Sequence, residues 1–233
     1  MINAIRYELT RLATVRSTWV LLCTGLGLQA AVAYVYASKT DLTAREQFVY
    51  SFTGLSLTLV TLCITAVAVN ALGHEFRYGT VATTVLVLRD RGRVLAAKAL
   101  TAAGVAACAS LALVGVTLLV QLLVSAVPSE AWRVAQVTGA VAVYAVLAAL
   151  AGLGLVAVTG NATLSMVAVL AVPSVVEIAG MLAGIDPSLL PFHAAAQLVT
   201  PSEGNPVLMV LPLLLLATGL LGVGAALFAR RDL

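Results

Sequence analysis

The sequence predicts an all-α membrane protein, a polytopic bundle of six spanning helices. Of its 233 residues, 61% are hydrophobic and only 10% are charged, and the mean hydropathy is +1.07. Soluble domains average about a quarter charged residues. Six apolar runs each reach about 18 residues or more, which at about 1.5 Å per residue is enough to cross a hydrocarbon core of about 30 Å. Because lipid offers the backbone no partners, runs that are long and do not alternate are helices rather than barrel strands.

An amphipathic helix is expected before the first span, over residues 1–17. Ile2, Ile5, Leu9 and Leu12 recur there at helical spacing, and the charged side chains fall on other faces. Such a helix lies in the plane of the lipid headgroups with its apolar side down. The alternative is a cytoplasmic extension of the first span.

The six spans and their connections form one domain, residues 1–233. The connection at 184–206 carries four prolines around a short apolar stretch. Because proline cannot continue a helix, we expect one or two short external half-helices there, which dip into the outer leaflet or cap the bundle. The predicted spans are 18–37, 52–72, 99–127, 134–159, 163–183 and 207–229.

The distribution of basic residues predicts the orientation, because cytoplasmic loops of membrane proteins are enriched in Lys and Arg. With the N-terminus inside, three basic residues fall outside: Lys39, Arg45 and Arg133. Both termini are therefore expected in the cytoplasm, and the net charge of +3 reflects topology rather than nucleic-acid binding. The basic residues on the inner side are Arg6, Arg11, Arg16, Arg77, Arg89, Arg91, Arg93, Lys98, Arg230 and Arg231.

No motif for ATP hydrolysis or metal binding is recognisable in the sequence. A phosphate-binding loop needs a lysine after glycine, whereas the two lysines follow Ser38 and Ala97. His74–Glu75 begins like a zinc-protease motif, but Tyr78 stands where the second histidine is required. The three cysteines are isolated within spans. We therefore expect neither an enzyme nor a resident cofactor or metal.

The charged segment 74–98, between the second and third spans, is the most informative part of the chain. It begins with Glu75, Phe76, Arg77, Gly79 and Thr80, and arginines follow at 89, 91 and 93 before Lys98. The positive-inside rule alone explains the arginines. It does not explain the apolar run 85–88 between the charges, which needs a partner or the membrane surface to cover it.

This segment resembles the corresponding loop of type-2 ATP-binding-cassette permeases, the membrane subunits of many bacterial exporters. The shared pattern is Glu75, then Gly79 and Thr80, then Arg93 and Lys98. The ending Phe228-Ala-Arg-Arg-Asp, the amphipathic N-terminal helix and the long connection before the last span are also similar to that family. The likeness covers the whole chain, but its specific part is about 25 residues.

The resemblance implies a cytoplasmic coupling helix that binds a separate ATPase subunit. Thr80 is suited to cap a helix over 81–88, and Gly79 allows an unusual backbone angle. The Glu75 carboxylate would contact the partner. The implied coupling residues are Glu75, Phe76, Arg77, Gly79, Thr80, Arg89 and Arg93.

The family likeness also implies an assembly and a location. Two permease chains, either identical or sister subunits, would work with two copies of the ATPase, which bind ATP and Mg²⁺. The assembly would lie among the lipids of a bacterial inner membrane and export an amphiphile: a drug, an antibiotic, a lipid or a glycolipid. The rival functions are an ion-gradient-driven transporter, which usually carries several intramembrane charges, and a non-transporting scaffold.

Glu177 is the only acidic residue inside a predicted span. A carboxylate there costs about 3 kcal/mol on insertion scales unless it is protonated, paired or facing water. One hypothesis places it on the substrate path or makes it sensitive to protons. The other is that its side chain reaches the interface or a neighbouring hydroxyl.

Overall fold

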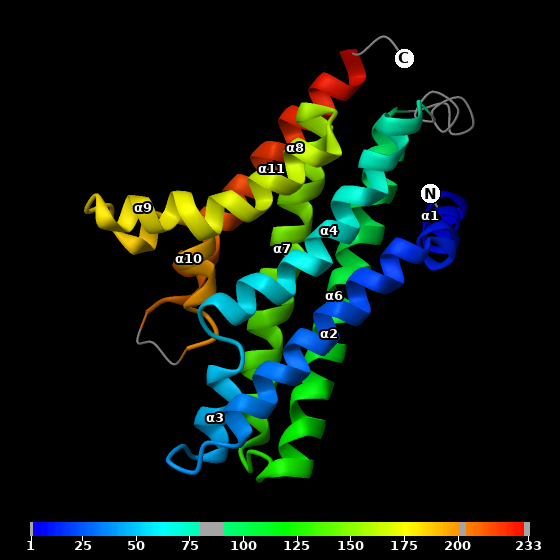
Figure 1. The fold of residues 1–233 in the computed structure, drawn as a ribbon. Helices are drawn as coiled ribbons and strands as arrows, with labels where there is room; N and C mark the ends of the chain where they lie inside the picture. The colour runs from blue at the N-terminus through cyan, green and yellow to red at the C-terminus, as the bar shows by residue number, and fades with distance from the viewer. Residues whose placement is uncertain (1, 80–90, 201–203, 231–233) are drawn as a thin grey trace.

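The structure, a computed structural model, describes residues 2–79, 91–200 and 204–230, and in these ranges the regular structure is entirely helical. Figure 1 shows the helices in chain order. They are α1 (Ile2–Thr14), α2 (Arg16–Ala37), α3 (Ala44–Tyr50), α4 (Leu55–Tyr78), α6 (Arg91–Val124), α7 (Ala131–Thr159), α8 (Ala162–Ala171), the π-helix η1 (Val172–Val176), α9 (Glu177–Leu182), the 3₁₀ turn η2 (Pro187–Leu189), α10 (Pro191–Ala196) and α11 (Pro206–Arg230).

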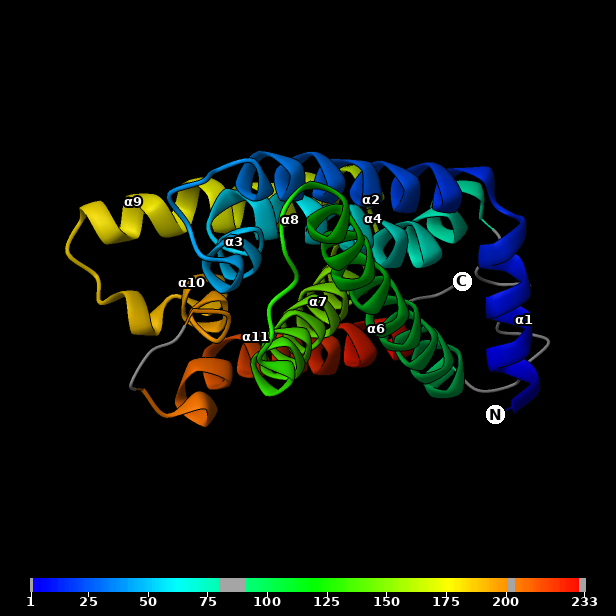
Figure 2. The same cartoon turned by 90° about the horizontal axis from the view of Figure 1, so that it is seen from below.

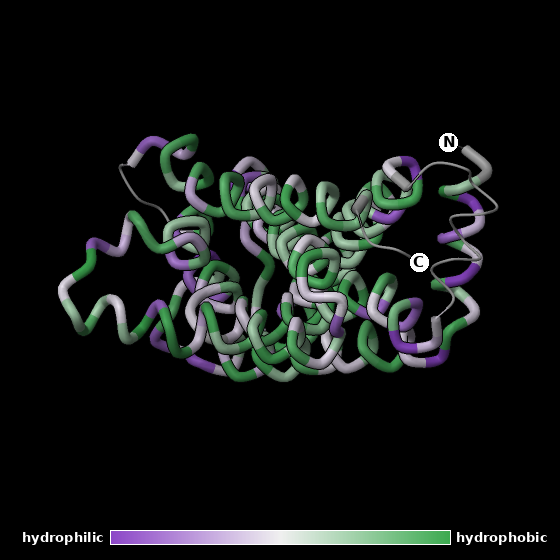
Figure 3. Tube along the Cα trace, turned by 90° about the horizontal axis from the view of Figure 1, so that it is seen from above, coloured by the Kyte–Doolittle hydropathy of each residue, from purple (hydrophilic) through white to green (hydrophobic). Residues whose placement is uncertain are grey.

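Six of these helical segments are long and apolar enough to cross a membrane, as the sequence predicts: α2, α4, α6, α7, the continuous run α8–η1–α9, and α11. The chain therefore has the architecture of a multi-pass membrane protein. In Figure 3 the bodies of these helices are hydrophobic, and hydrophilic residues gather around α1 and at helix ends.

Helices α4 and α7 form the centre of the bundle and are buried along most of their length. Helix α7 packs against α4, α6 and α11. Small residues bring two of these helices very close together. A Cβ atom at Gly154 of α7 would lie 2.8 Å from the backbone of α11 at Leu220, and one at Gly224 of α11 would lie 3.1 Å from the Gly154 carbonyl oxygen. Glycines at these positions therefore allow the two backbones to touch.

The second and third spans are longer than the apolar runs that predict them. Helix α4 continues to Tyr78, and α6 begins at Arg91, so the charges at both ends of segment 74–98 belong to helices that are continuous with the spans. The 34 residues of α6 extend over about 51 Å at 1.5 Å per residue. One end of α6 therefore projects beyond a hydrocarbon core of about 30 Å.

The connection between the first two spans, residues 38–51, contains the helix α3. Thr43 and Glu46 form a capping box, in which each side chain accepts a hydrogen bond from the other residue's backbone N–H. Hydrogen bonds from the backbone and hydroxyl of Thr43 hold the pKa of Glu46 below its usual value. Phe48 and Val49 turn inward and join the core.

The fifth span contains a π-helical turn at 172–176. Pro173 has no N–H and cannot complete the regular α-helical pattern, and α9 continues after this turn away from the bundle (Figures 1 and 2). After α9 the chain forms η2 and α10, two short helical segments within the proline-rich connection where half-helices are expected.

The start of α1, the end of α4, the start of α6 and the end of α11 lie at one end of the molecule, called here the terminal end (Figure 1). Helix α3 and the α6–α7 turn lie at the opposite, distal end. Helix α1 crosses the spans at a steep angle instead of extending α2 (Figure 2), and its residues Ala4, Glu8 and Leu12 are buried. This arrangement suits a helix lying in the membrane plane.

Candidate functional site

At the terminal end, four charged side chains from three helices form a cluster that we call the ionic junction: Glu8 and Arg11 of α1, Glu75 of α4 and Lys98 of α6. The Lys98 ammonium donates to Glu8 Oε1 at 2.7 Å and to Glu75 Oε1 at 2.8 Å. Arg11 donates to the same oxygen of Glu75 and lies 3.5 Å from Glu8 Oε2. Two cations therefore balance two carboxylates.

Three of the four side chains of the ionic junction are almost completely buried, and the fourth, Arg11, is 22% exposed. Lys98 is 1% exposed, Glu75 2% and Glu8 3%. Burial makes each charge dependent on its partners, because a buried charge that loses its counter-ion costs about 3–5 kcal/mol. Lys98 also donates to the carbonyl of Ala71 at 3.3 Å, one turn before Glu75. The junction therefore holds α1, α4 and α6 in a fixed relation.

The sequence-predicted coupling residues divide between this junction and its surroundings. Phe76 and Arg77 lie in the last turn of α4, and Gly79 ends that helix in the left-handed conformation, with φ +67° and its N–H bound to the Glu75 carbonyl. Arg93 is exposed in the first turn of α6. Thr80 and Arg89, like the helix expected over 81–88, lie outside the described residues.

Glu75 does not occupy the position expected for direct contact with a partner. Its carboxylate is buried against Lys98 and Arg11, so it binds within the chain. Glu75 therefore joins α4 to α1 and α6 and presents no charge at the surface of the chain.

A second contact at this end joins α4 to α11. The rings of Phe76 and Phe228 meet edge to face, with centroids 6.1 Å apart and an interplanar angle of 90°. Phe228 is 1% exposed. Edge-to-face pairs of this kind add about 0.5–1.5 kcal/mol beyond the burial of their area. The end of the sixth span is thus fixed to the same turn of α4 that carries Glu75.

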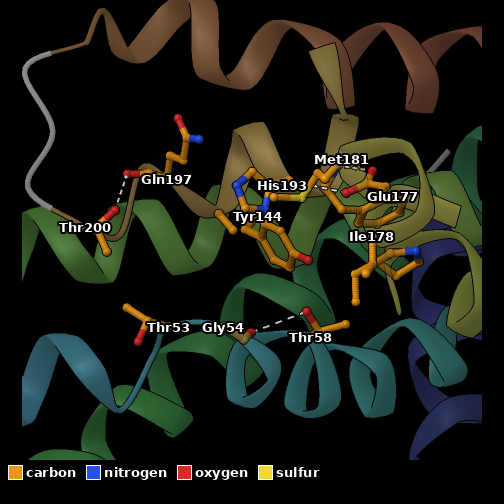
Figure 4. A pocket seen from close by; sticks show the side chains of 13 residues that line it. Thr53, Gly54, Thr58, Tyr144, Glu177, Ile178, Met181, His193, Gln197 and Thr200 are labelled. Atoms are coloured by element: carbon orange, nitrogen blue, oxygen red, sulfur yellow. Dashed lines mark hydrogen bonds between the residues drawn. The ribbon is translucent and has the colours of Figure 1, made fainter. Parts of the chain in front are cut away.

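Towards the distal end, a cavity of about 390 Å³ lies between the start of α4, α7, the π-helical turn, α9 and α10. We call it the distal cavity, and Figure 4 shows its lining. Thr53 and Gly54 come from the α3–α4 connection, and Gln197 and Thr200 come from the segment after α10. The other lining residues are Thr58, Tyr144, Pro173, Glu177, Ile178, Met181, Phe192, His193 and Ala196.

Glu177 lines the distal cavity at the point where α9 begins. One carboxylate oxygen accepts the backbone N–H of Phe192 and the other that of His193, both at 2.8 Å. The residue is 4% exposed, so its side chain does not reach a surrounding interface. Of the partners expected for Glu177, a neighbouring hydroxyl is not the one found. Its carboxylate binds two backbone N–H groups of α10 instead. Helix α10 is thereby attached to the fifth span.

Two aromatic rings lie beside this carboxylate. Tyr144 and Phe192 pack at 70° with centroids 6.3 Å apart. Tyr144 is 1% exposed and lies on α7, the central helix of the bundle. The site therefore combines a carboxylate, two aromatic rings and apolar walls.

Sequence reasoning did not assign a role to Glu8 or to the pairing of Lys98. A signal was present, because Glu8 and Arg11 stand at i,i+3 spacing, which brings their side chains together on a helix. The structure buries Glu8 together with Leu12, so the expectation that the charged side chains fall on other faces than the apolar ones is wrong for Glu8. Lys98, likewise, is followed directly by an apolar run and needs a counter-ion there. Which carboxylates would meet it depends on how α1 crosses the spans, and periodicity does not reveal this.

Within the described parts of the chain, no group of three or more His, Cys, Asp or Glu side chains is placed to hold a metal ion. A comparison with models of known protein families and with curated proteins finds no match. The ionic junction and the distal cavity are therefore the features from which a function is inferred.

Proposed function

We propose that this chain is the permease subunit of an ATP-driven exporter of the type-2 ATP-binding-cassette kind, which moves an amphiphile across a bacterial inner membrane. Two permease chains would form the path, and two copies of a separate ATPase would bind and hydrolyse ATP. The basis is the sequence resemblance together with one structural observation, the ionic junction.

The ionic junction supports this function because of what it connects. Segment 79–90 joins the end of α4 to the start of α6, and both helices continue without a break into spans. Lys98 and Glu75 join these two helix ends to each other, and Glu8 and Arg11 join them to α1. Because rigid helices transmit displacement along their length, a force on the segment would move two spans and α1 together.

The surface around the segment fits a protein partner. Arg77 is exposed at the end of α4 and Arg93 at the start of α6, and Thr80, Arg89 and the apolar run 85–88 lie between them in the sequence. Charged residues at the rim of an interface steer association, while an apolar centre contributes affinity. In this proposal Glu75 positions the helices, and the arginines contact the ATPase.

The proposal requires an ATP-binding-cassette ATPase gene beside that of this chain, and it is tested by co-expression with that ATPase, followed by co-purification and ATP-dependent transport in vesicles. We expect the ATPase to co-purify with the native chain, and Arg77→Glu combined with Arg89→Glu to reduce its recovery at least tenfold. Lys39→Glu combined with Arg45→Glu is the matched control, because it makes the same total charge change at the distal end, where it should leave recovery unchanged.

Equal recovery of the ATPase with the native chain and the double variant would overturn the coupling assignment. Transport that needs an ion gradient and proceeds without any ATPase would instead favour a secondary transporter. The two results are separable, because the first measures association and the second measures the energy source.

A further inference from the structure

Glu177 is a buried carboxylate that forms no ion pair with Lys or Arg in the described parts of the chain. Its hydrogen bonds come from two backbone N–H groups. The ionic junction is different, because there each carboxylate meets a lysine and an arginine. A carboxylate inside a spanning helix, next to a cavity, gains most from a cation that enters the cavity.

The remaining lining of the distal cavity fits such a cation. The paired rings of Tyr144 and Phe192 are electron-rich surfaces that attract positive charge. Ile178, Met181 and Pro173 supply apolar walls. Neither Lys nor Arg lines the cavity, and His193 is the one basic side chain among the residues that line it. A volume of about 390 Å³ falls within the range of about 300–1,000 Å³ typical of small-molecule sites.

We propose that the distal cavity binds the positively charged group of a lipophilic cation, with Glu177 as counter-ion and Tyr144 and Phe192 as aromatic walls. This names the substrate class and rests on the proposed export function, whereas the binding itself does not depend on an ATPase. Because Glu177 also holds α10, a bound cation would contact the carboxylate that positions this helix.

The test uses the full chain in lipid nanodiscs without any ATPase, with radiolabelled tetraphenylphosphonium as the probe. Tetraphenylborate has the same shape and the opposite charge, and empty nanodiscs give the partitioning background. We expect saturable binding of the phosphonium and no saturable binding of the borate. Saturable binding of both ions, or of neither, would overturn the proposal.

Variants place the binding in this cavity. Glu177→Gln keeps the size of the side chain and an acceptor for α10, and it should weaken phosphonium binding at least tenfold. Asp186→Asn is the matched control, because it also neutralises one carboxylate but lies exposed outside the cavity. Native affinity in Glu177→Gln, or an equal loss in both variants, would contradict the assignment.

If Glu177→Gln does not remain monodisperse, a second pair of variants tests whether the phosphonium binds in the distal cavity. Phe192→Leu removes an aromatic wall and should weaken phosphonium binding about threefold or more. Phe48→Leu is its control, since Phe48 is likewise buried in the core but lies outside the cavity. Equal binding in these two variants would overturn the proposal. Failure here would leave the ATPase co-purification result intact, so the two proposals fail separately.

Discussion

The ammonium group of Lys98 lies 2.7 Å from a carboxylate oxygen of Glu8, although ninety positions separate the two residues. This contact fixes α1 against α6, and Glu75 extends the fixation to α4. Because it is formed across the bundle, it reports directly on whether the terminal end is assembled.

Removing Lys98 should destabilise this end more than removing a matched pair of charges. Lys98→Met leaves two buried carboxylates facing Arg11 alone, and we expect a loss of about 3 kcal/mol. Adding Glu8→Gln restores the balance as one Arg11–Glu75 pair, and it should recover at least half of that loss. Thermal unfolding of the single and double variants in nanodiscs measures both effects. A double variant less stable than Lys98→Met would show that the two residues are not coupled.

The contact between α7 and α11 should depend on the absence of a side chain at Gly154. Gly154→Ala would place a Cβ atom 2.8 Å from the α11 backbone, and we expect a destabilisation of about 1–3 kcal/mol. Gly219→Ala is the control on the partner helix, where a Cβ atom meets nothing within 4 Å. It should be neutral or stabilise by up to about 1 kcal/mol. Equal melting temperatures for the two variants would contradict the close packing.

Gln47 should protect the connection between α2 and α3 from proteolysis. Its amide donates to the Lys39 carbonyl at 2.9 Å and accepts from the Ser125 hydroxyl at 2.9 Å. Gln47→Leu removes both bonds, and trypsin should then cleave after Lys39 several times faster than in the native chain. Gln136→Leu, which replaces an exposed glutamine on α7, should leave the rate unchanged. The same rate in both variants would mean that these bonds do not order the connection.

Residues at the two ends of the molecule should label from opposite sides of the membrane. With the native cysteines replaced by alanine, Ser129→Cys at the distal end should react with an impermeant maleimide on intact cells. Tyr78→Cys, at the terminal end and 70% exposed, should react only after permeabilisation. The reverse pattern would invert the predicted orientation and would place segment 79–90 where no cytoplasmic ATPase can reach it.

The sequence by itself determined that this is an all-helical membrane protein with six spans. An apolar run long enough to cross a bilayer is a local property, and its backbone must satisfy its own hydrogen bonds. The proline-rich connection likewise indicates short helical segments because proline ends helices. Even α3 is marked locally, by the Thr43–Glu46 capping box at its start.

The tertiary structure alone decided what the charged residues contact. Glu75, expected at a partner's surface, is instead buried against Arg11 and Lys98, because α1 turns across the spans and brings distant charges together. Glu177 accepts hydrogen bonds from the start of α10, because the chain turns back after α9 and brings that helix beside the fifth span. Helix periodicity depends on residues that are close in the sequence. These pairings depend instead on the angles at which the helices cross, and packing along the whole length of the helices sets those angles.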